Sequence, residues 1–249
     1  MISTKQYIEL RNNDPKNPEI IEYNKALLER YPFMEPRNVW TGEAIEDYDY
    51  SWTLADDIPD GWRISFGDLM LEELREELIK FNYLNDYRPL QIKEKYGTLR
   101  WYDSGIPAGE LSEDYKEATL PLNVPIKVQH REEVAIEIGR DNYTPFDSKT
   151  DWEEYERLNK DCKVHYRIYR IVDKCKVHDI IGKYEDLSII TCIDCGAQTK
   201  PLYAQKGWIN YVCKDCAKKR LKRMIEVYRD HPLKFEEMFE PVKLVKLTE

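Results

Sequence analysis

The sequence predicts an α+β fold in which helices pack on a small antiparallel sheet. An amphipathic helical pattern runs from Arg63 to about Leu84, and a strand–turn–strand pattern follows from Tyr87 to Tyr102. We expect this hairpin to pack with this helix and with the cysteine-containing module of the C-terminal part of the chain. The length of 249 residues allows one large domain or two small ones, and 42% hydrophobic residues are enough for a core.

The two best-defined helices have local reasons for their position. Asn17 is a good N-cap and Pro18 suits the first helical position, so a helix is expected from Pro18 until Pro32 stops it. In the longer helix, apolar residues recur at helical spacing on one face and glutamates occupy the other. The predicted apolar face contains Phe66, Leu69, Met70, Leu74, Leu78 and Phe81.

The hairpin turns at Gly97, which tolerates a positive φ, and Leu99 and Trp101 alternate with polar residues on the returning strand. We therefore expect Trp101 to be buried. Elsewhere, strands are predicted over 126–130, 134–138, 166–172 and 242–247, and helices over 150–159, 174–188, 215–229 and 232–239.

Four of the six cysteines form two Cys-x2-Cys pairs, separated by 17 residues: Cys192, Cys195, Cys213 and Cys216. This spacing is typical of zinc sites, and four thiolates would close a tetrahedral shell around a structural Zn²⁺. Disulfides are the alternative, which a reducing cytoplasm disfavours. The chain is accordingly divided into an N-terminal α+β core (1–104), a central insertion (105–173) and a C-terminal zinc-ribbon module (174–249).

The other two cysteines belong to a Cys-Lys-Val-His tetrapeptide that occurs twice, 13 residues apart. The residues of this repeat that could bind a metal are Cys162, His165, Cys175 and His178. A second zinc site is one interpretation of this repeat, and two buried cysteines with two surface histidines are the other.

Charge is distributed unevenly over a chain whose net charge is −9. Residues 192–223 contain eight basic and two acidic residues, and the helix expected there presents Lys218, Lys219, Lys222 and Arg223. These cations suit nucleic-acid phosphates. A solvated basic face, or one that docks on the acidic half of the same protein, is the alternative.

The densest acidic stretch, 43–60, has seven carboxylates and no Lys or Arg, and the aromatic residues Tyr48, Tyr50, Trp52 and Trp62 lie among or beside them. It is a solvated loop, an acidic–aromatic docking surface for a protein partner, or a mimic of a nucleic-acid backbone. No phosphate-binding glycine loop, nucleophile elbow or metalloprotease helix motif occurs, so we expect no enzyme.

A nucleotide-like ligand has a set of candidate cationic and stacking residues, namely Arg63, Arg100, Trp101 and Tyr102. The alternative is that Trp101 belongs to the core. No run of 18 apolar residues and no apolar leader at Met1–Leu10 are present, so we expect a cytoplasmic protein with no membrane partner.

Five motifs occur together over residues 31–104 and 176–217. They are Asp60-Gly-Trp62, Ile92-Lys-Glu-Lys-Tyr-Gly-Thr-Leu-Arg-Trp-Tyr102, Cys-x2-Cys-Gly, Gly207-Trp-Ile209 and Cys-x2-Cys. This combination resembles a family of uncharacterised small proteins of bacteriophages and prophages. The resemblance implies a phage accessory protein that is expressed in a bacterial host, and it implies no particular activity.

The leading functional expectation is a non-enzymatic, zinc-containing interaction protein that binds and modulates a host protein, such as a component of a defence system. A nucleic-acid-binding zinc-ribbon protein is the first alternative. A protein that binds or sequesters a nucleotide-like small ligand is the second.

Overall fold

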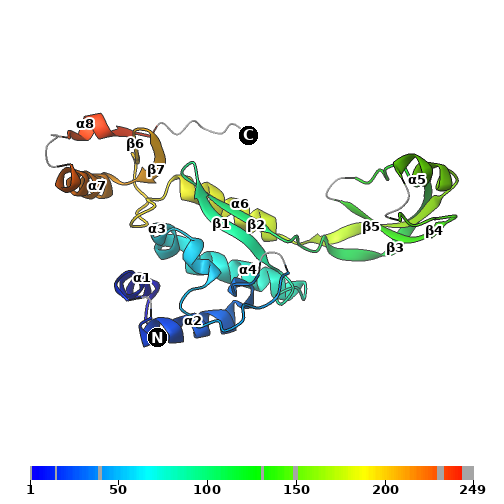
Figure 1. Cartoon of the computed structure of the whole chain (residues 1–249), viewed down its shortest axis with the longest axis horizontal. Helices are drawn as coiled ribbons and strands as arrows, with labels where there is room; N and C mark the ends of the chain where they lie inside the picture. Colours follow the sequence, from blue (N-terminus) through cyan, green and yellow to red (C-terminus); the bar gives the residue numbers. More distant parts are fainter. Residues whose placement is uncertain are drawn as a thin grey trace. The chain divides into compact units, whose positions relative to one another are not determined.

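The computed structural model describes residues 2–14, 16–38, 41–129, 132–147, 151–228 and 233–242 (Figure 1). Its described residues form an α+β structure with three small antiparallel sheets. The chain divides into two compact units, Met1–Ile106 with Lys176–Glu249, and Pro107–Cys175. Each end of the second unit is two residues from the corresponding end of the insertion predicted over 105–173. The two flanking segments, which were treated as separate modules, share one unit.

The first unit opens with α1 (Thr4–Asn13) and α2 (Pro18–Arg30). The prediction for α2 is confirmed, because the Asn17 side chain accepts a hydrogen bond from the Glu19 amide at 2.9 Å and Pro18 is the first helical residue. Two short 3₁₀ turns, η1 (Pro32–Met34) and η2 (Leu54–Asp57), follow along the chain.

The long helix consists of α3 (Asp60–Trp62), a π-helical turn η3 (Arg63–Gly67) and α4 (Asp68–Lys80). Most of its predicted apolar face is buried, namely Phe66, Met70, Leu74 and Leu78. Leu69 was predicted wrongly, because it is 58% exposed while Leu71 is buried. Leu71 follows Phe66 by five residues, which is the spacing of a π-helical turn and not of an α-helical one.

The predicted hairpin is present as β1 (Pro89–Lys95) and β2 (Thr98–Asp103). Its two turn residues, Tyr96 and Gly97, both have a positive φ, of 56° and 76°. Trp101 is buried as predicted, and its indole Nε1 donates to the Tyr87 hydroxyl at 2.8 Å. The helix α6 (Val177–Ile189) packs against both β2 and α4 (Figure 1), so α6 is the helix that covers the hairpin, where the long helix was expected.

The C-terminal part of the first unit contains β6 (Tyr203–Gln205), β7 (Trp208–Val212), α7 (Lys214–Val227), α8 (Phe235–Met238) and β8 (Phe239–Pro241), with strand order β7-β6-β8. The helix predicted over 215–229 is α7. The short helix predicted over 232–239 is present only as α8, and the strand predicted over 242–247 lies outside the described residues except for Val242.

The second unit contains a sheet of order β3-β5-β4, from β3 (Gly109–Pro121), β4 (Glu133–Asp141) and β5 (Lys163–Lys174), and the helix α5 (Trp152–Leu158). The strands predicted over 134–138 and 166–172 fall within β4 and β5. Residues 126–129 form no strand, and residue 130 lies outside the described residues. β3 was not predicted, because charged and polar residues occupy both of its faces and leave no alternating pattern.

Candidate metal centre

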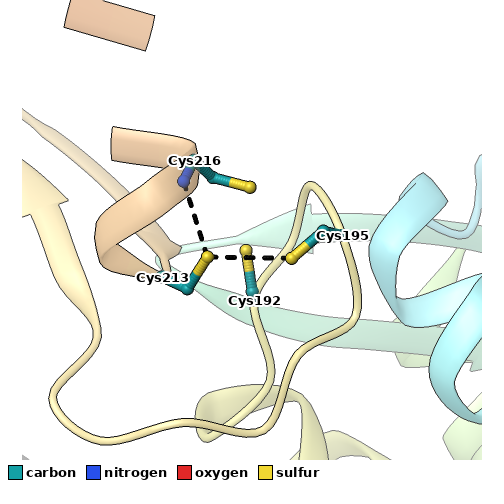
Figure 2. A group of neighbouring side chains, drawn as sticks. All are labelled: Cys192, Cys195, Cys213 and Cys216. Atoms are coloured by element: carbon teal, nitrogen blue, oxygen red, sulfur yellow. Dashed lines mark hydrogen bonds between the residues drawn. The ribbon is translucent and has the colours of Figure 1, made fainter. Parts of the chain in front are cut away.

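The four cysteines of the two Cys-x2-Cys pairs come together in the first unit (Figure 2). Their sulfur atoms all lie within 4.8 Å of one another, and the Sγ atoms of Cys195 and Cys213 are 3.7 Å apart. A tetrahedral ion with metal–sulfur bonds of about 2.3 Å separates its sulfur ligands by about 3.8 Å. The cluster therefore has the donor atoms and the dimensions to hold one four-coordinate metal ion.

Each pair of cysteines is shaped by its local backbone. The first pair lies on a turn in which the Gly196 amide donates to the Cys192 carbonyl at 2.9 Å, and Gly196 has a φ of 76°. In the second pair, Cys213 is the N-cap of α7, and its Sγ accepts a hydrogen bond from the Cys216 amide at 3.5 Å (Figure 2). Amide groups that point at a sulfur stabilise the thiolate form, which is the form that binds a metal.

Burial alone works against these thiolates. It raises the pKa of Cys192 to about 11 and raises the pKa of Cys216 as well. Burial also opposes ionisation of Cys213, but hydrogen bonds from the Cys216 amide and from the neighbouring thiols together outweigh it and lower the pKa of the Cys213 thiol. A metal cation would supply the positive charge that lets all four thiols ionise near neutral pH.

The first cysteine pair is held against the start of the long helix. The Gly61 amide donates to the Ile193 carbonyl at 2.8 Å, and Trp62 Nε1 donates to the Thr191 carbonyl at 3.0 Å. A Cβ on Gly61 would lie 2.4 Å from the Cys192 carbonyl oxygen, and one on Gly196 would lie 2.5 Å from the Gly61 carbonyl oxygen. The two glycines thus allow a backbone approach that no larger residue permits.

The hairpin contacts the same region. A Cβ on Gly97 would lie 2.8 Å from the ring of Tyr211 on β7. The motifs Asp60-Gly-Trp62, Cys-x2-Cys-Gly and the hairpin turn are far apart in sequence. They meet around the cysteine cluster.

The structure does not bring together the four residues of the second proposed zinc site. Cys162 and Cys175 immediately precede and follow the 12-residue strand β5, which at about 3.3 Å per residue places them about 40 Å apart. His165 Nε2 lies 2.8 Å from Asp141 Oδ2, and His178 Nε2 lies 3.2 Å from Asp103 Oδ2. One ion cannot be bound by both cysteines of a single chain.

The four residues suggested for a nucleotide-like ligand form no open stacking pocket. Arg63 is only 2% exposed and pairs with Asp56, and Trp101 is part of the core. Arg100 pairs with Glu185 at 3.4 Å, and Tyr102 is 47% exposed. Neighbouring residues on β2 point to opposite faces, so Trp101 cannot share a surface with Arg100 and Tyr102.

A buried ionic cluster was not predicted from the sequence. Asp56 accepts from Arg63 Nη1 at 2.5 Å and from Arg11 Nη1 at 2.6 Å, and Arg11 also pairs with Asp60 at 2.6 Å. The Arg63 guanidinium lies 4.5 Å from the centroid of the Tyr7 ring. Burial opposes the charge of Asp56, but Arg63, the Thr53 amide and Arg11 together outweigh it and lower the pKa of Asp56. Burial and the nearby Asp56 raise the pKa of Tyr7 to about 12.

The basic residues of α7 are exposed as expected, namely Lys218, Lys219, Lys222 and Arg223. Arg220 on the same helix instead pairs with Asp194, between the first two cysteines, at 2.5 Å. One cation of the helix therefore pairs with the turn of the first two cysteines, and the others face solvent.

Comparison with known proteins adds no family or function, since no protein-family model, no curated protein and no solved structure matches this chain. Among the described residues, no helix is both long enough and apolar enough to cross a membrane.

Proposed function

We propose that the protein is a non-enzymatic binding protein, stabilised by Zn²⁺, that uses its acidic segment 43–60 to bind a basic surface of another protein. The observation that carries this proposal is that the segment gathers its aromatic rings while most of its carboxylates stay exposed. The resemblance to phage accessory proteins suggests that the partner is a bacterial host protein, for which a defence component is a suitable candidate.

The aromatic cluster of the acidic segment consists of Tyr48, Tyr50 and Trp52. The ring centroid of Tyr48 lies 4.7 Å from that of Tyr50 and 6.5 Å from that of Trp52, and the Tyr48 hydroxyl donates to the Trp52 carbonyl. The buried side chain of Asn24 on α2 donates to the Tyr50 carbonyl at 2.8 Å and anchors the segment. Trp52 is 41% exposed, so it offers apolar surface to a partner.

The backbone of this segment is held in an uncommon conformation. Asp47 and Tyr50 have φ angles of 56° and 59°, in the left-handed region that few non-glycine residues adopt. Such conformations persist where the surroundings determine them, and they are frequent in binding segments. This conformation supports the proposal that the segment is a binding surface.

The carboxylates of the segment divide into two groups. Asp56 and Asp60 pair with arginines inside the protein. Five others are exposed, namely Glu43, Glu46, Asp47, Asp49 and Asp57. Residues 41–60 contain no Lys or Arg, so this surface carries a single sign of charge and favours association with a basic partner.

The ligands favour Zn²⁺ as the bound ion. Four thiolates in a closed tetrahedral shell are typical of structural Zn²⁺ sites, and such a shell leaves no position for a reacting water. The β6–β7 hairpin followed by α7 would then be a zinc ribbon. In this proposal the metal stabilises the part of the first unit where the cysteine turns, Gly61 and the hairpin turn meet. The acidic segment contacts the partner protein.

Capture of bacterial lysate proteins on the immobilised full chain, quantified by mass spectrometry, tests this function. We expect one or a few basic proteins to be retained, with retention weakened as salt is raised. The test variant converts the five exposed carboxylates to amides (Glu43→Gln, Glu46→Gln, Asp47→Asn, Asp49→Asn, Asp57→Asn) and should lose these proteins. The matched control converts five exposed carboxylates elsewhere (Glu113→Gln, Asp114→Asn, Glu132→Gln, Glu153→Gln, Asp161→Asn) and should retain them.

Equal retention by the two variants would contradict the proposal. So would submicromolar binding of mixed-sequence DNA or RNA at about 150 mM salt, if reversal of the charges of Lys218, Lys219, Lys222 and Arg223 abolished it. That result would favour the nucleic-acid alternative, because exposed cations on one helix give the steep salt dependence of phosphate contacts.

A further inference from the structure

The second unit, Pro107–Cys175, buries very few side chains. Among its described residues the buried ones are Asn159, Cys162, Val164 and Cys175. Its large exposed apolar residues are Tyr115, Val124, Ile136, Ile138, Tyr143, Phe146, Trp152, Leu158 and Val172. A segment of this size needs a hydrophobic core or a partner to offset the entropy lost on folding.

The two edges of its sheet differ. β5 is central, and β3 and β4 are the outer strands. β3 carries a charged run and two register irregularities, both of which discourage further pairing. The charged residues of this run are Glu113, Asp114, Lys116 and Glu117. β4 also has charged residues and one bulge, but its stretch 134–136 is uncharged, and it exposes 43% of Ile136 and 49% of Ile138.

The backbone of β4 has polar groups directed away from the sheet. The Ile171 amide on β5 donates to the Glu132 carbonyl at 2.8 Å, so the backbone groups of Glu132 face β5. In an antiparallel pair this direction alternates from residue to residue. The amide and carbonyl groups of Ala135 and Glu137 therefore face outward, where no strand pairs with β4 among the described residues.

We propose that β4 pairs antiparallel with β4 of a second copy of this chain, with the two-fold axis at Ile136, to form a continuous six-stranded sheet. In this register, Ala135 lies opposite Glu137 of the second copy, and their outward amide and carbonyl groups form hydrogen bonds. Ile136 lies opposite Ile136 of the second copy, and Val134 is a diagonal neighbour of that residue. Val134 and Ile136 lie on one face of β4, so the apolar side chains next to the axis cover one another.

Charge selects this register over its neighbours. A shift by two residues in one direction would place Glu137 opposite Glu137 and Glu133 opposite Asp141. The opposite shift would place Glu133 opposite Glu137. Like charges directly opposite each other destabilise a strand pair. In the proposed register, Glu137 faces only Ala135, and its own charge is paired with Arg140 at 2.6 Å.

The paired segment is short, because a bulge interrupts β4 between Glu137 and Gly139. We therefore expect a modest affinity, with dimers forming at micromolar concentrations. A second copy suits this strand because, about a two-fold axis at Ile136, apolar residues meet apolar residues and no like charges lie directly opposite each other. The proposal is independent of the function proposed above, whose acidic segment belongs to the first unit.

Analytical ultracentrifugation of the full chain, between about 1 and 100 µM, tests the dimer. The mass should rise from that of one chain, 29.8 kDa, toward twice that value. Ile136→Lys would place two ammonium groups opposite each other at the axis, and should raise the dissociation constant about tenfold or more. Ala135→Pro removes an outward amide without removing a bond to β5, and should have the same effect.

The matched control is Tyr115→Lys, which adds the same charge on the other edge strand. Tyr115 has the same exposed fraction as Ile136, 43%, and lies on the same face, since Tyr115 and Val134 both pair with Tyr169. It should leave the dissociation constant unchanged. Circular dichroism establishes that each variant folds. If Ile136→Lys does not fold, Ala135→Pro tests the dimer in its place.

A wild-type chain that stays monomeric up to 100 µM would overturn the proposal. Equal weakening by Tyr115→Lys and Ile136→Lys would also overturn it, because the contact would then not be specific to β4. A dimer that neither Ile136→Lys nor Ala135→Pro weakens would place the interface elsewhere.

Discussion

Cys192→Ser is expected to release the metal ion and to unfold the region that the four cysteines hold together. The Sγ of Cys192 is fully buried in the cluster, and metal affinity at such a site is folding free energy. Structural Zn²⁺ contributes about 10–16 kcal/mol of apparent binding free energy in zinc-finger peptides, which exceeds the stability of most domains. Elemental analysis should show the metal lost, and limited proteolysis should show new cleavage between 190 and 228.

Cys162→Ser is the matched control for this change. Cys162 is also a buried cysteine, at 1% exposed, but it lies outside the cluster. It should keep its full metal content and its protease resistance between 190 and 228. Retention of one ion per chain by Cys192→Ser, with unchanged proteolysis, would contradict the structural role of the metal.

Asp56→Asn is expected to cost about 3–5 kcal/mol of unfolding free energy, because it leaves the buried Arg63 without its counter-charge. The Arg63 guanidinium is 2% exposed and depends on Asp56 at 2.5 Å. Urea denaturation of the wild type and of Asp56→Asn measures this cost. The control Asp47→Asn removes an exposed carboxylate of the same segment and should change stability by less than about 0.5 kcal/mol.

The same cluster predicts a dependence on pH. The pKa of Asp56 is lower in the folded protein than in the unfolded chain, so its ionised form stabilises the fold at neutral pH. This contribution is complete above the unfolded value of about 3.9 and is lost as the pH falls through the lower folded value. Wild type should therefore lose more stability than Asp56→Asn on acidification below about pH 4. Parallel stability–pH curves for the two proteins would contradict this assignment.

Local patterns predicted most of the first unit, and they did so for physical reasons that act over a few residues. Asn17-Pro18 specifies the start of α2, and Gly97 specifies the hairpin turn. The two Cys-x2-Cys pairs predicted the four-cysteine cluster because each pair has its geometry set by its own turn.

The features that escaped prediction depend on contacts between distant segments. Arg11 and Asp56 are 45 residues apart in sequence, and no local pattern relates them. The close approach of Gly61 to Gly196 is likewise visible only in the fold. The π-helical turn shifted Leu69 out of the core, which an α-helical period could not anticipate.

The repeated Cys-Lys-Val-His tetrapeptide shows how spacing alone misleads. Thirteen residues can return a chain to the same ion if it turns between the two cysteines. Here the intervening segment is the continuous strand β5, which carries Cys175 away from Cys162.

The most direct test of the central claim is the metal content of the wild-type chain, purified without chelator and measured by elemental analysis. The four-cysteine centre predicts one zinc per chain, released together with the fold of the C-terminal region when a strong chelator is added. Protein that folds with no bound zinc, and whose stability a chelator leaves unchanged, would contradict it.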